Sequence, residues 1–489
     1  MASNNNDMKH SDSQPASLPR RQWLTRSGTA LAAALGAGTL GNLFSVRPAY
    51  ADDYKALVCI FLFGGNDGMN TIVPIDATRY PQYSSVRGSL AIPQANLLTL
   101  GSTGFGLHPA LSGLTTAWSD GALAPVFNVG PLVQPLTKAQ YVAAAAATST
   151  TLLPDNLFSH EDQQTLWQAA SGDSFARTGW GGRASDAMGT VNPVISLSGS
   201  ARFGLSDTHQ SLVVPPPGYT FGADGLQATD NYASALLRQA AVTALYAQTQ
   251  ETALASAYAG IQQNAFGMSS RLGSLIKIAP GDPNAVAAID SAFSSLISGN
   301  TVTTPLGAQM YQIAKMIAGN ATVQGSRQIF FASLGNFDTH GGQAVTGSPA
   351  TGTQATLLKQ VGDALGAFYG ALKALGLSTA VTSFTQSDFG RTFAPNNSTG
   401  TDHGWGNHHL VMGGSVKGAK TYGNYPSLVL GGADDVGVNS WELQGRWIPT
   451  TSVDQYAATL LSWFGASSSQ LASVLPNLAS FPSANIGFV

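Results

Sequence analysis

The feature of this chain that most constrains its fold is the segment YKALVCIFLFGGNDGMNTIVP, residues 54–74. An unbroken apolar run of strand length, residues 56–63, ends there in two glycines, an asparagine and an aspartate. Such a run predicts a strand that is buried on both faces, as in parallel sheets covered by helices on both sides. Because open α/β sheets carry their functional groups just beyond the carboxyl ends of the strands, we expect Asn66 and Asp67 beside a functional site.

The rest of the chain alternates strand-like and helical segments, which predicts an α/β layered fold. Four further strands are expected at residues 124–130, 193–199, 327–335 and 379–390. The segment 355–375 has apolar residues at helical spacing and predicts a crossover helix between two strands. A long tract rich in Ala, Leu and Gln, broken near APGDPN, predicts a helical insertion over residues 225–320. We expect one domain over residues 52–489.

The first 51 residues predict a twin-arginine export signal rather than part of the fold. Arg20 and Arg21 precede an apolar run over residues 29–44, and small residues up to Ala51 suit a cleavage site. The alternative is a membrane anchor, but the run is shorter than the roughly 18–20 residues that a span needs. We therefore expect a periplasmic or secreted protein with no stable membrane span after cleavage. Twin-arginine substrates cross the membrane folded, which suits proteins that acquire a metal in the cytoplasm.

The charge of the mature chain argues against nucleic acid as a partner. Cleavage after Ala51 leaves 18 basic and 24 acidic residues, a net charge of −6. The sequence has no basic stripe that would follow a phosphate backbone. The single cysteine, Cys59, lies in the apolar run and is expected to be buried.

Five short motifs contain most of the unusual polar residues: GGNDG (64–68), FSHEDQ (158–163), NFDTHGGQ (336–343), SDFGRT (387–392) and DHGWGNHH (402–409). Three of them directly follow predicted strands, so they are expected to converge on one rim of the sheet. Carboxylates and imidazoles together suit zinc or harder divalent cations. We predict one or two divalent metal ions, either zinc or calcium, magnesium or manganese. The predicted ligands are Asp67, Asp338, His340, Asp388 and His403.

A metal site of this kind suits hydrolysis, because metals can hold the attacking and leaving oxygens of a phosphoryl or sulfuryl transfer. Ser159 is the candidate nucleophile, and Arg391 is the candidate clamp for an anionic substrate. Asn66, His160 and His408 are expected to contact the substrate. His408 and His409 are adjacent, so in an extended segment they face opposite ways and at most one faces the site.

Each of these residues also has a structural interpretation. Asp67 can stabilise a turn, and Ser159 can cap a helix. Asp338 with His340 can form an Asx turn. Asp388 with Arg391 can form an ion pair at a helix start. The joint occurrence of the motifs, in a chain with only 10% charged residues, favours the functional interpretation.

The chain resembles the exported bacterial proteins of domain-of-unknown-function family 1501. The resemblance rests on the export signal and on FLFGGNDGMNTIVP, FSHEDQQTLWQ, GWGGRASD, DTHGGQ, SDFGRT, DHGWGNHHLVMGGSVKG and PTTSVDQYAATLLSWFG. That family is grouped with the alkaline phosphatase and sulfatase superfamily. The resemblance implies a central, mostly parallel sheet sandwiched by helices, with metal ligands at the strand ends. It matches Ser159 to the superfamily's nucleophile, and it matches the five predicted ligands to its metal-binding residues.

The function expected from these features is an exported metal-dependent hydrolase of phosphate or sulfate esters. Its substrate would be a small or polymer-borne anionic ester. One alternative is a periplasmic binding or assembly protein that keeps the fold without catalysis. A second is a metal-free esterase built on Ser159, although the chain lacks a G-x-S-x-G elbow around that serine. The sequence leaves the oligomeric state open.

Overall fold

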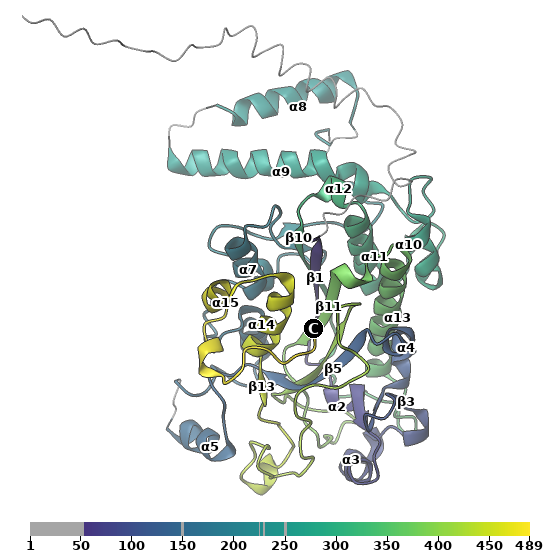
Figure 1. Ribbon diagram of the computed structural model, residues 1–489, viewed down its shortest axis with the longest axis vertical. Coiled ribbons are helices and arrows are strands. Elements are labelled where there is room, and N and C mark those ends of the chain that lie inside the picture. The colour runs from purple at the N-terminus through teal and green to yellow at the C-terminus, as the bar shows by residue number, and fades with distance from the viewer. Residues whose placement is uncertain (1–52, 148–150, 224, 228–229, 249–251) are drawn as a thin grey trace, which may run out of the picture. The chain divides into compact units, whose positions relative to one another are not determined.

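The apolar run folds into strand β1 (Lys55–Leu62), which lies inside an eight-stranded sheet of order β13-β5-β12-β11-β1-β10-β6-β7 (Figure 1). Along its length β1 pairs in parallel with β10 (Arg327–Leu334) on one side and with β11 (Val381–Ser387) on the other. Alternate side chains from Ala56 to Leu62 belong to one core cluster, and those between them belong to a second. Both faces of β1 are therefore buried, as the sequence predicts.

The computed structural model describes residues 53–147, 151–223, 225–227, 230–248 and 252–489. These residues belong to one unit, and the predicted export signal over residues 1–51 lies outside them. In these ranges, no helix is both long and apolar enough to cross a membrane.

The other strands of the main sheet are β5 (Leu123–Gly130), β6 (Ile195–Ser196), β7 (Leu212–Val213), β12 (Asn407–Met412) and β13 (Thr451–Ser452). All pairings are parallel except those that β12 makes with β11 and β5. Two small antiparallel sheets contain β2 (Ile72–Pro74), β3 (Leu98–Thr99) and β4 (Phe105–Leu107), and β8 (Ile297–Ser298) and β9 (Thr301–Val302). The predicted α/β class and mostly parallel central sheet are confirmed.

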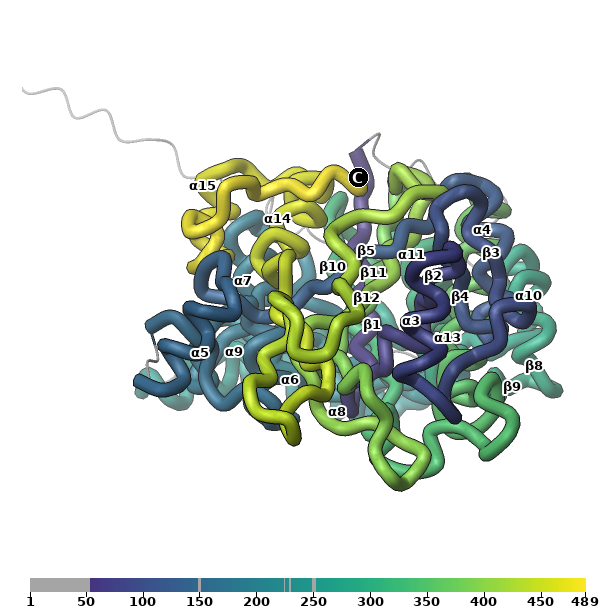
Figure 2. Tube along the Cα trace, turned by 90° about the horizontal axis from the view of Figure 1, so that it is seen from below, coloured from purple at the N-terminus to yellow at the C-terminus, as the bar shows by residue number. Residues whose placement is uncertain are grey.

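Helices cover both faces of the sheet (Figure 2). Those that contribute to the first core cluster are α4 (Thr115–Ser119), α9 (Ala253–Lys277), α10 (Ala287–Ala292), α11 (Pro305–Ala318), α12 (Asn320–Val323) and α13 (Thr353–Ala374). Those that contribute to the second are α6 (His160–Ala169), α7 (Trp180–Met188), α14 (Val453–Phe464) and α15 (Ser468–Val474). The remaining helices are α2 (Gly68–Thr71), α3 (Arg79–Arg87), α5 (Lys138–Ala146) and α8 (Ala233–Tyr246).

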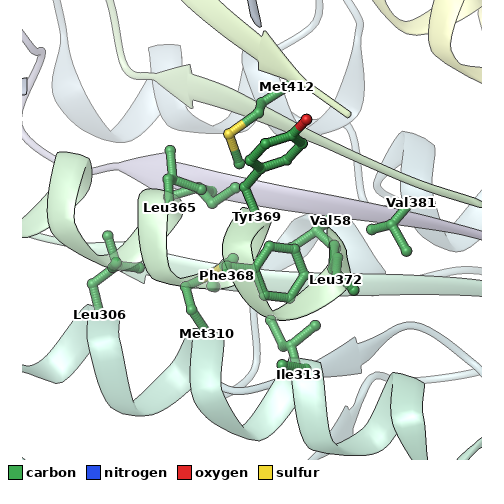
Figure 3. Close-up of a cluster of buried hydrophobic side chains, with 14 of the residues drawn as sticks. Val58, Leu306, Met310, Ile313, Leu365, Phe368, Tyr369, Leu372, Val381 and Met412 are labelled. Atoms are coloured by element: carbon green, nitrogen blue, oxygen red, sulfur yellow. The ribbon is translucent and has the colours of Figure 1, made fainter. Parts of the chain in front are cut away.

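Helix α13 is the predicted crossover between β10 and β11. Its apolar side chains Leu365, Phe368 and Leu372 pack against Met310 of α11 and Val58 of β1 (Figure 3). Each fully buried side chain of this size contributes on the order of 1.5–3 kcal/mol. This layer fixes the positions of the strands whose carboxyl ends carry the polar motifs.

The tract expected to be a helical insertion divides into two parts. Helix α8 and the first half of α9 are largely exposed and lie side by side outside the sheet layers (Figure 1). The break near APGDPN separates α9 from α10, as expected. Helix α11, by contrast, is buried along its length and belongs to the layer that covers the sheet. The segment outside the α/β layers is therefore shorter than residues 225–320, because the apolar face of α11 packs on α13 and the strands.

The adjacent histidines of β12 are both structural. His408 packs against Phe127 and Tyr425, whereas His409 packs against Trp167 and Tyr456. Burial lowers the pKa of each imidazole to about 3, so both are neutral in the folded protein at neutral pH.

We expect these histidines to make the fold sensitive to acid. In an unfolded chain histidine has a pKa of about 6.5, so below that pH the unfolded state binds protons that the folded state does not. The free energy of unfolding should therefore fall between pH 7 and pH 5, by up to about 1.4 kcal/mol per pH unit for each histidine. The loss should end only near the folded pKa of about 3. Chemical denaturation of the wild type and His409→Leu at pH 7, 6 and 5 tests this. A slope in His409→Leu as steep as in the wild type would contradict it.

Candidate metal centre

Three loops meet at the carboxyl edge of the central sheet: those after β1 and β10, and the connection between β11 and β12. Gly64 follows β1, Asp338 follows β10 and Asp388 follows β11. His403 precedes β12, and because β12 is antiparallel to β11, its first residues lie at the same edge. The main-chain N–H of Gly64 donates to Asp388 Oδ1 at 3.1 Å, which ties the loop after β1 to the loop after β11. The predicted convergence of the motifs at one rim is confirmed for these three loops.

Three imidazoles and one carboxylate form a compact group at this edge, which we call the His/Asp cluster: His160, Asp338, His340 and His403. One ligand atom from each residue lies within 4.8 Å of all the others, so the group can hold a metal ion. Asp338 Oδ1 lies 3.3 Å from His160 Nε2, 3.1 Å from His340 Nε2 and 3.6 Å from His403 Nε2. A tetrahedral ion with bonds of about 2.0–2.1 Å separates its ligand atoms by about 3.3–3.4 Å, so these spacings fit.

The second nitrogen of each imidazole faces an oxygen that orients the ring. His160 Nδ1 lies 2.7 Å from Asp388 Oδ2, His340 Nδ1 2.9 Å from Asp402 Oδ1, and His403 Nδ1 2.6 Å from the main-chain oxygen of Phe158. Carboxylate and carbonyl oxygens accept hydrogen bonds, so the Nδ1 atoms carry the protons. The Nε2 lone pairs then face the centre of the cluster, which is the usual arrangement around a bound metal.

This arrangement leaves lone pairs that need a cation. His340 Nε2 and His403 Nε2 lie 2.8 Å apart, a separation at which two lone pairs repel unless a proton or a metal ion lies between them. Around a tetrahedral ion the two atoms would have to separate by about half an ångström. His160 Nε2 is buried and makes no hydrogen bond to any described residue. Coordination to one metal ion would engage the lone pairs of all three nitrogens at once.

The charges around the cluster favour ligands that are ready to bind a metal. Burial raises the pKa of the Asp338 carboxyl, but the hydrogen bond and charge of Arg391 outweigh this, and the pKa lies below its usual value. Burial lowers the pKa of His403, which keeps its imidazole neutral. The hydrogen bond to Asp388 raises the pKa of His160, so a metal would compete there with a proton.

The His/Asp cluster is open to solvent. The side chains of Asp338 and His340 are each 45% exposed, and those of His160 and His403 are 27% and 24% exposed. Structural zinc sites are enclosed, whereas catalytic sites keep a position for water or substrate. The exposure is therefore compatible with access to a bound ion.

Ser159 lies directly before His160 at the N-cap position of α6. Its side chain makes no capping hydrogen bond, although the sequence also allowed that role. The preceding residue, Phe158, has a positive φ of 75° and uses its main-chain oxygen to orient His403. The hydroxyl of Ser159 is thus not used in capping the helix and lies next in the chain to a member of the cluster.

Arg391 does not have the position expected of a substrate clamp, since its side chain is 0% exposed. Its guanidinium donates to the main-chain oxygens of Gly64, Gly65, Phe337 and Thr401 and forms an ion pair with Asp338. These partners accept the hydrogen bonds of the guanidinium, which lies beneath the cluster and does not face a substrate. Arg391 joins the loops of β1, β10 and β11 and holds Asp338 in place.

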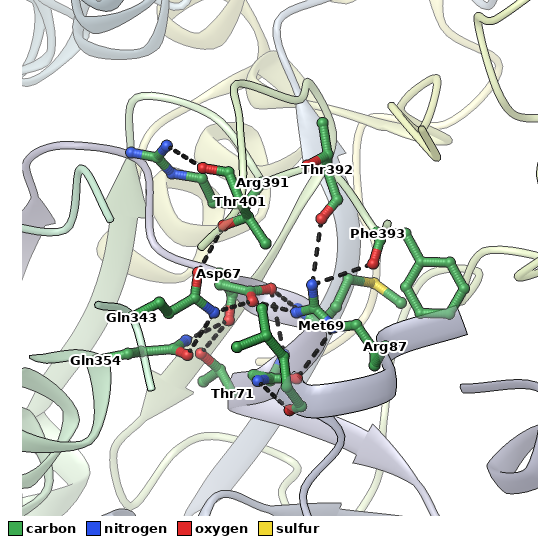
Figure 4. A network of polar contacts seen from close by, with 12 residues as sticks. Asp67, Met69, Thr71, Arg87, Gln343, Gln354, Arg391, Thr392, Phe393 and Thr401 are labelled. Atoms are coloured by element: carbon green, nitrogen blue, oxygen red, sulfur yellow. Dashed lines mark hydrogen bonds and ion pairs between the residues drawn. The ribbon is translucent and has the colours of Figure 1, made fainter. Parts of the chain in front are cut away.

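Asp67 lies in a buried polar network outside the His/Asp cluster (Figure 4). Its carboxylate caps α2 through the main-chain N–H groups of Met69 and Asn70, and it forms a fully buried ion pair with Arg87. Gln343 Nε2 donates to the same carboxylate at 2.6 Å. These partners neutralise the Asp67 carboxylate and satisfy its hydrogen bonds. Asp67, a predicted ligand, is therefore not a member of the cluster.

Three other predicted site residues are buried and do not belong to the cluster. Asp388 is buried and orients His160. The main-chain N–H of Asn66 donates to Ser387 Oγ, and its side chain bonds to Thr71. His408 is buried and accepts a hydrogen bond from the main-chain N–H of Asn128 through Nδ1. None of these side chains is exposed to a substrate.

Sequence reasoning missed four contributors to this site: His160 as a cluster member, Asp402 and the Phe158 carbonyl as ring-orienting groups, and Arg446. Arg446 Nε donates to the main-chain oxygen of His403 at 2.9 Å. The adjacency of Asp402 to His403 was a usable signal. The others depend on contacts across more than 40 residues of sequence and gave no local signal.

The fold and the site together define a mostly parallel α/β protein with a three-histidine, one-aspartate cluster at the carboxyl edge of its sheet. The chain belongs to the family described as Protein of unknown function (DUF1501), which matches residues 54–443. Among curated proteins, none matches the chain. The family match spans all four residues of the His/Asp cluster.

The geometry predicts that loss of a ligand and loss of a ring-orienting group lower the metal content by different amounts. Purified wild-type protein loaded with zinc should hold about one equivalent, and His403→Ala should hold close to none, because one of four ligands is lost. Asp402→Ala should bind zinc about 10- to 100-fold more weakly, since it only orients His340. Metal analysis after gel filtration, with a zinc titration, gives both values.

Asp67→Ala is the matched test outside the cluster. It leaves Arg87 buried without its carboxylate, which should lower the free energy of unfolding by about 3–5 kcal/mol. The fraction that remains folded should keep its zinc. Loss of zinc from a stably folded Asp67→Ala protein would contradict this assignment.

Proposed function

We propose that this chain is a metal-dependent hydrolase of phosphate or sulfate esters that is exported through the twin-arginine route. The observation that carries the proposal is the convergence of three imidazole nitrogens and one carboxylate oxygen at metal-ligand spacing on an open edge of the sheet. The export route rests on the sequence around Arg20 and Arg21. The ester class rests on the resemblance to the alkaline phosphatase and sulfatase superfamily and on the charge of the site.

The ligand set favours zinc over calcium or magnesium. Three imidazoles with one carboxylate suit zinc, whereas calcium and magnesium prefer shells made of oxygen. The described residues contain a single group of this kind, so we infer one ion per chain. Such an ion, held by the His/Asp cluster, would supply Lewis acidity toward an ester oxygen and its attacking group.

The charge of the site favours an anionic substrate. Three carboxylates, on Asp338, Asp388 and Asp402, and two guanidiniums, on Arg391 and Arg446, lie at or next to the cluster. With neutral imidazoles and a divalent cation, the formal charge is +1. A phosphate or sulfate ester would complete the neutralisation, and the exposed sides of Asp338 and His340 leave room for it to approach.

The chain's own groups supply orientation and a candidate nucleophile. Asp388, Asp402 and the Phe158 carbonyl hold the three rings and keep the proton of each on Nδ1. Ser159 stands at the N-terminus of α6, where the helix dipole favours negative charge that develops on its oxygen. Its hydroxyl is the candidate attacking group, and water is the alternative.

We expect zinc-loaded protein to hydrolyse at least one of a panel of aryl phosphate monoesters, phosphate diesters and sulfates. Chelation or His403→Ala should reduce the rate at least 100-fold, because the Lewis acid is lost. His209→Ala, a change at an exposed histidine outside the cluster, is the control and should retain the wild-type rate. The measurement is initial release of the aryl leaving group.

Other outcomes distinguish the rival functions. Zinc bound with no turnover of any ester would favour a binding or assembly protein. Hydrolysis that survives chelation but not Ser159→Ala would favour a metal-free esterase. If Ser159→Ala leaves metal-dependent turnover intact, the attacking group is water.

A further inference from the structure

The loop over residues 431–446 has a fixed main chain built around a buried carboxylate. Asp435 has no exposed surface and accepts hydrogen bonds of 2.8–3.2 Å from the main-chain N–H groups of Gly431, Gly437, Gly445 and Arg446. Lys138 Nζ donates to main-chain oxygens of the same loop at Gly431, Gly432 and Gly437. These charge-assisted bonds set the backbone position of Arg446 before any ligand binds.

The Arg446 side chain is also held in place, by His403 itself and by Phe158, which orients the His403 ring. Its Nε donates to the main-chain oxygen of His403 at 2.9 Å, and its guanidinium carbon lies 4.9 Å from the centroid of the Phe158 ring. The main-chain oxygen of Phe158 in turn accepts from His403 Nδ1. A cation held over an aromatic face and tied at Nε loses little further freedom on binding a ligand.

Among the described residues, the terminal nitrogens of this guanidinium make no hydrogen bond, although its charge contributes to the lowered pKa of Asp402 and of Glu442. In the described part of the chain, Arg446 forms no ion pair, and its only side-chain hydrogen bond comes from Nε. The side chain is half-buried, and its terminal nitrogens are not among the buried atoms that lack partners, so they are open to solvent. Arg391, the other arginine of the site, is by contrast enclosed by main-chain oxygens and Asp338.

We propose that Arg446 is an oxyanion subsite beside the His/Asp cluster, where its two terminal nitrogens bind the phosphate or sulfate group of the substrate. The inference rests on the proposed function and names the residue that recognises the anion. The paired N–H groups of a guanidinium match two oxygens of a tetrahedral oxyanion, which a lysine ammonium cannot do. Because Arg446 Nε donates to the main chain of His403, the bound anion would lie next to the ion that the cluster would hold.

The test measures binding instead of turnover. Inorganic phosphate and inorganic sulfate are titrated separately by calorimetry into zinc-loaded wild type, Arg446→Gln, Arg446→Lys and Arg238→Gln. Arg238, on α8, is the matched control, because its guanidinium also lies near an aromatic ring, that of Tyr232, but far along the chain from the cluster. We expect Arg446→Gln to weaken binding of at least one oxyanion about 10- to 100-fold at unchanged zinc content. Arg446→Lys should fall in between, and Arg238→Gln should match the wild type.

Two results would overturn the subsite: wild-type protein that binds neither oxyanion, or Arg446→Gln that binds both as tightly as the wild type. If Arg446→Gln does not fold, the Arg446→Lys titration decides, and affinity equal to the wild type would count against bidentate recognition. The subsite and the proposed function can fail separately. Binding that depends on Arg446 without hydrolysis of any ester would retain the subsite and reject the hydrolase. Ester hydrolysis with an unchanged KM in Arg446→Gln would do the reverse.

Discussion

The buried guanidinium of Arg391 is the interaction on which the architecture of the site depends. It joins the main chain after β1, β10 and β11 and fixes Asp338, the single carboxylate of the His/Asp cluster. Each main-chain oxygen that lost this donor would cost about 1–3 kcal/mol if it stayed buried. The loops can approach so closely only because of glycine: a Cβ on Gly64, at a φ of 112°, would lie 2.4 Å from the Asp338 nitrogen. The GGNDG motif is therefore explained by packing against the cluster, and its aspartate by the ion pair with Arg87.

Three hydrogen-bond acceptors behind the cluster orient the rings of three histidines that come from separate segments of the chain. Asp388, Asp402 and the Phe158 carbonyl each engage an Nδ1, and they come from the loop after β11, the loop before β12 and the turn before α6. These acceptors all belong to the protein, and each fixes the orientation of one ring. The same turn supports the guanidinium of Arg446 on its aromatic ring. Arg446, the proposed anion subsite, and the cluster are thus connected through Phe158 and His403.

The sequence predicted what depends on local pattern. The buried strand β1, the crossover helix α13 and the placement of Asp338 and His340 after β10 all follow from apolar runs and from where those runs stop. Strand β12, which His403 precedes, was not predicted. The sequence did not predict that His160 is a member of the cluster and that Asp388 only orients it. Asp388 directly follows β11 and is buried at the sheet edge, whereas His160, at the start of α6, lies over it. Asp67 was misplaced for a similar reason, since its partner Arg87 lies in α3, a helix with no unusual polar signal. A positive φ at Phe158 could not be anticipated, because an aromatic residue rarely adopts it.

We propose that the His/Asp cluster binds one metal ion through three imidazoles and one carboxylate. X-ray absorption at the zinc edge of the loaded protein tests it most directly, because it counts and identifies the ligand atoms without requiring a substrate. We expect four nitrogen or oxygen neighbours at about 2.0–2.1 Å, with the outer-shell scattering of three imidazole rings, or five neighbours if water also binds. A shell without imidazole scattering, or one that is unchanged in His160→Ala, would contradict it.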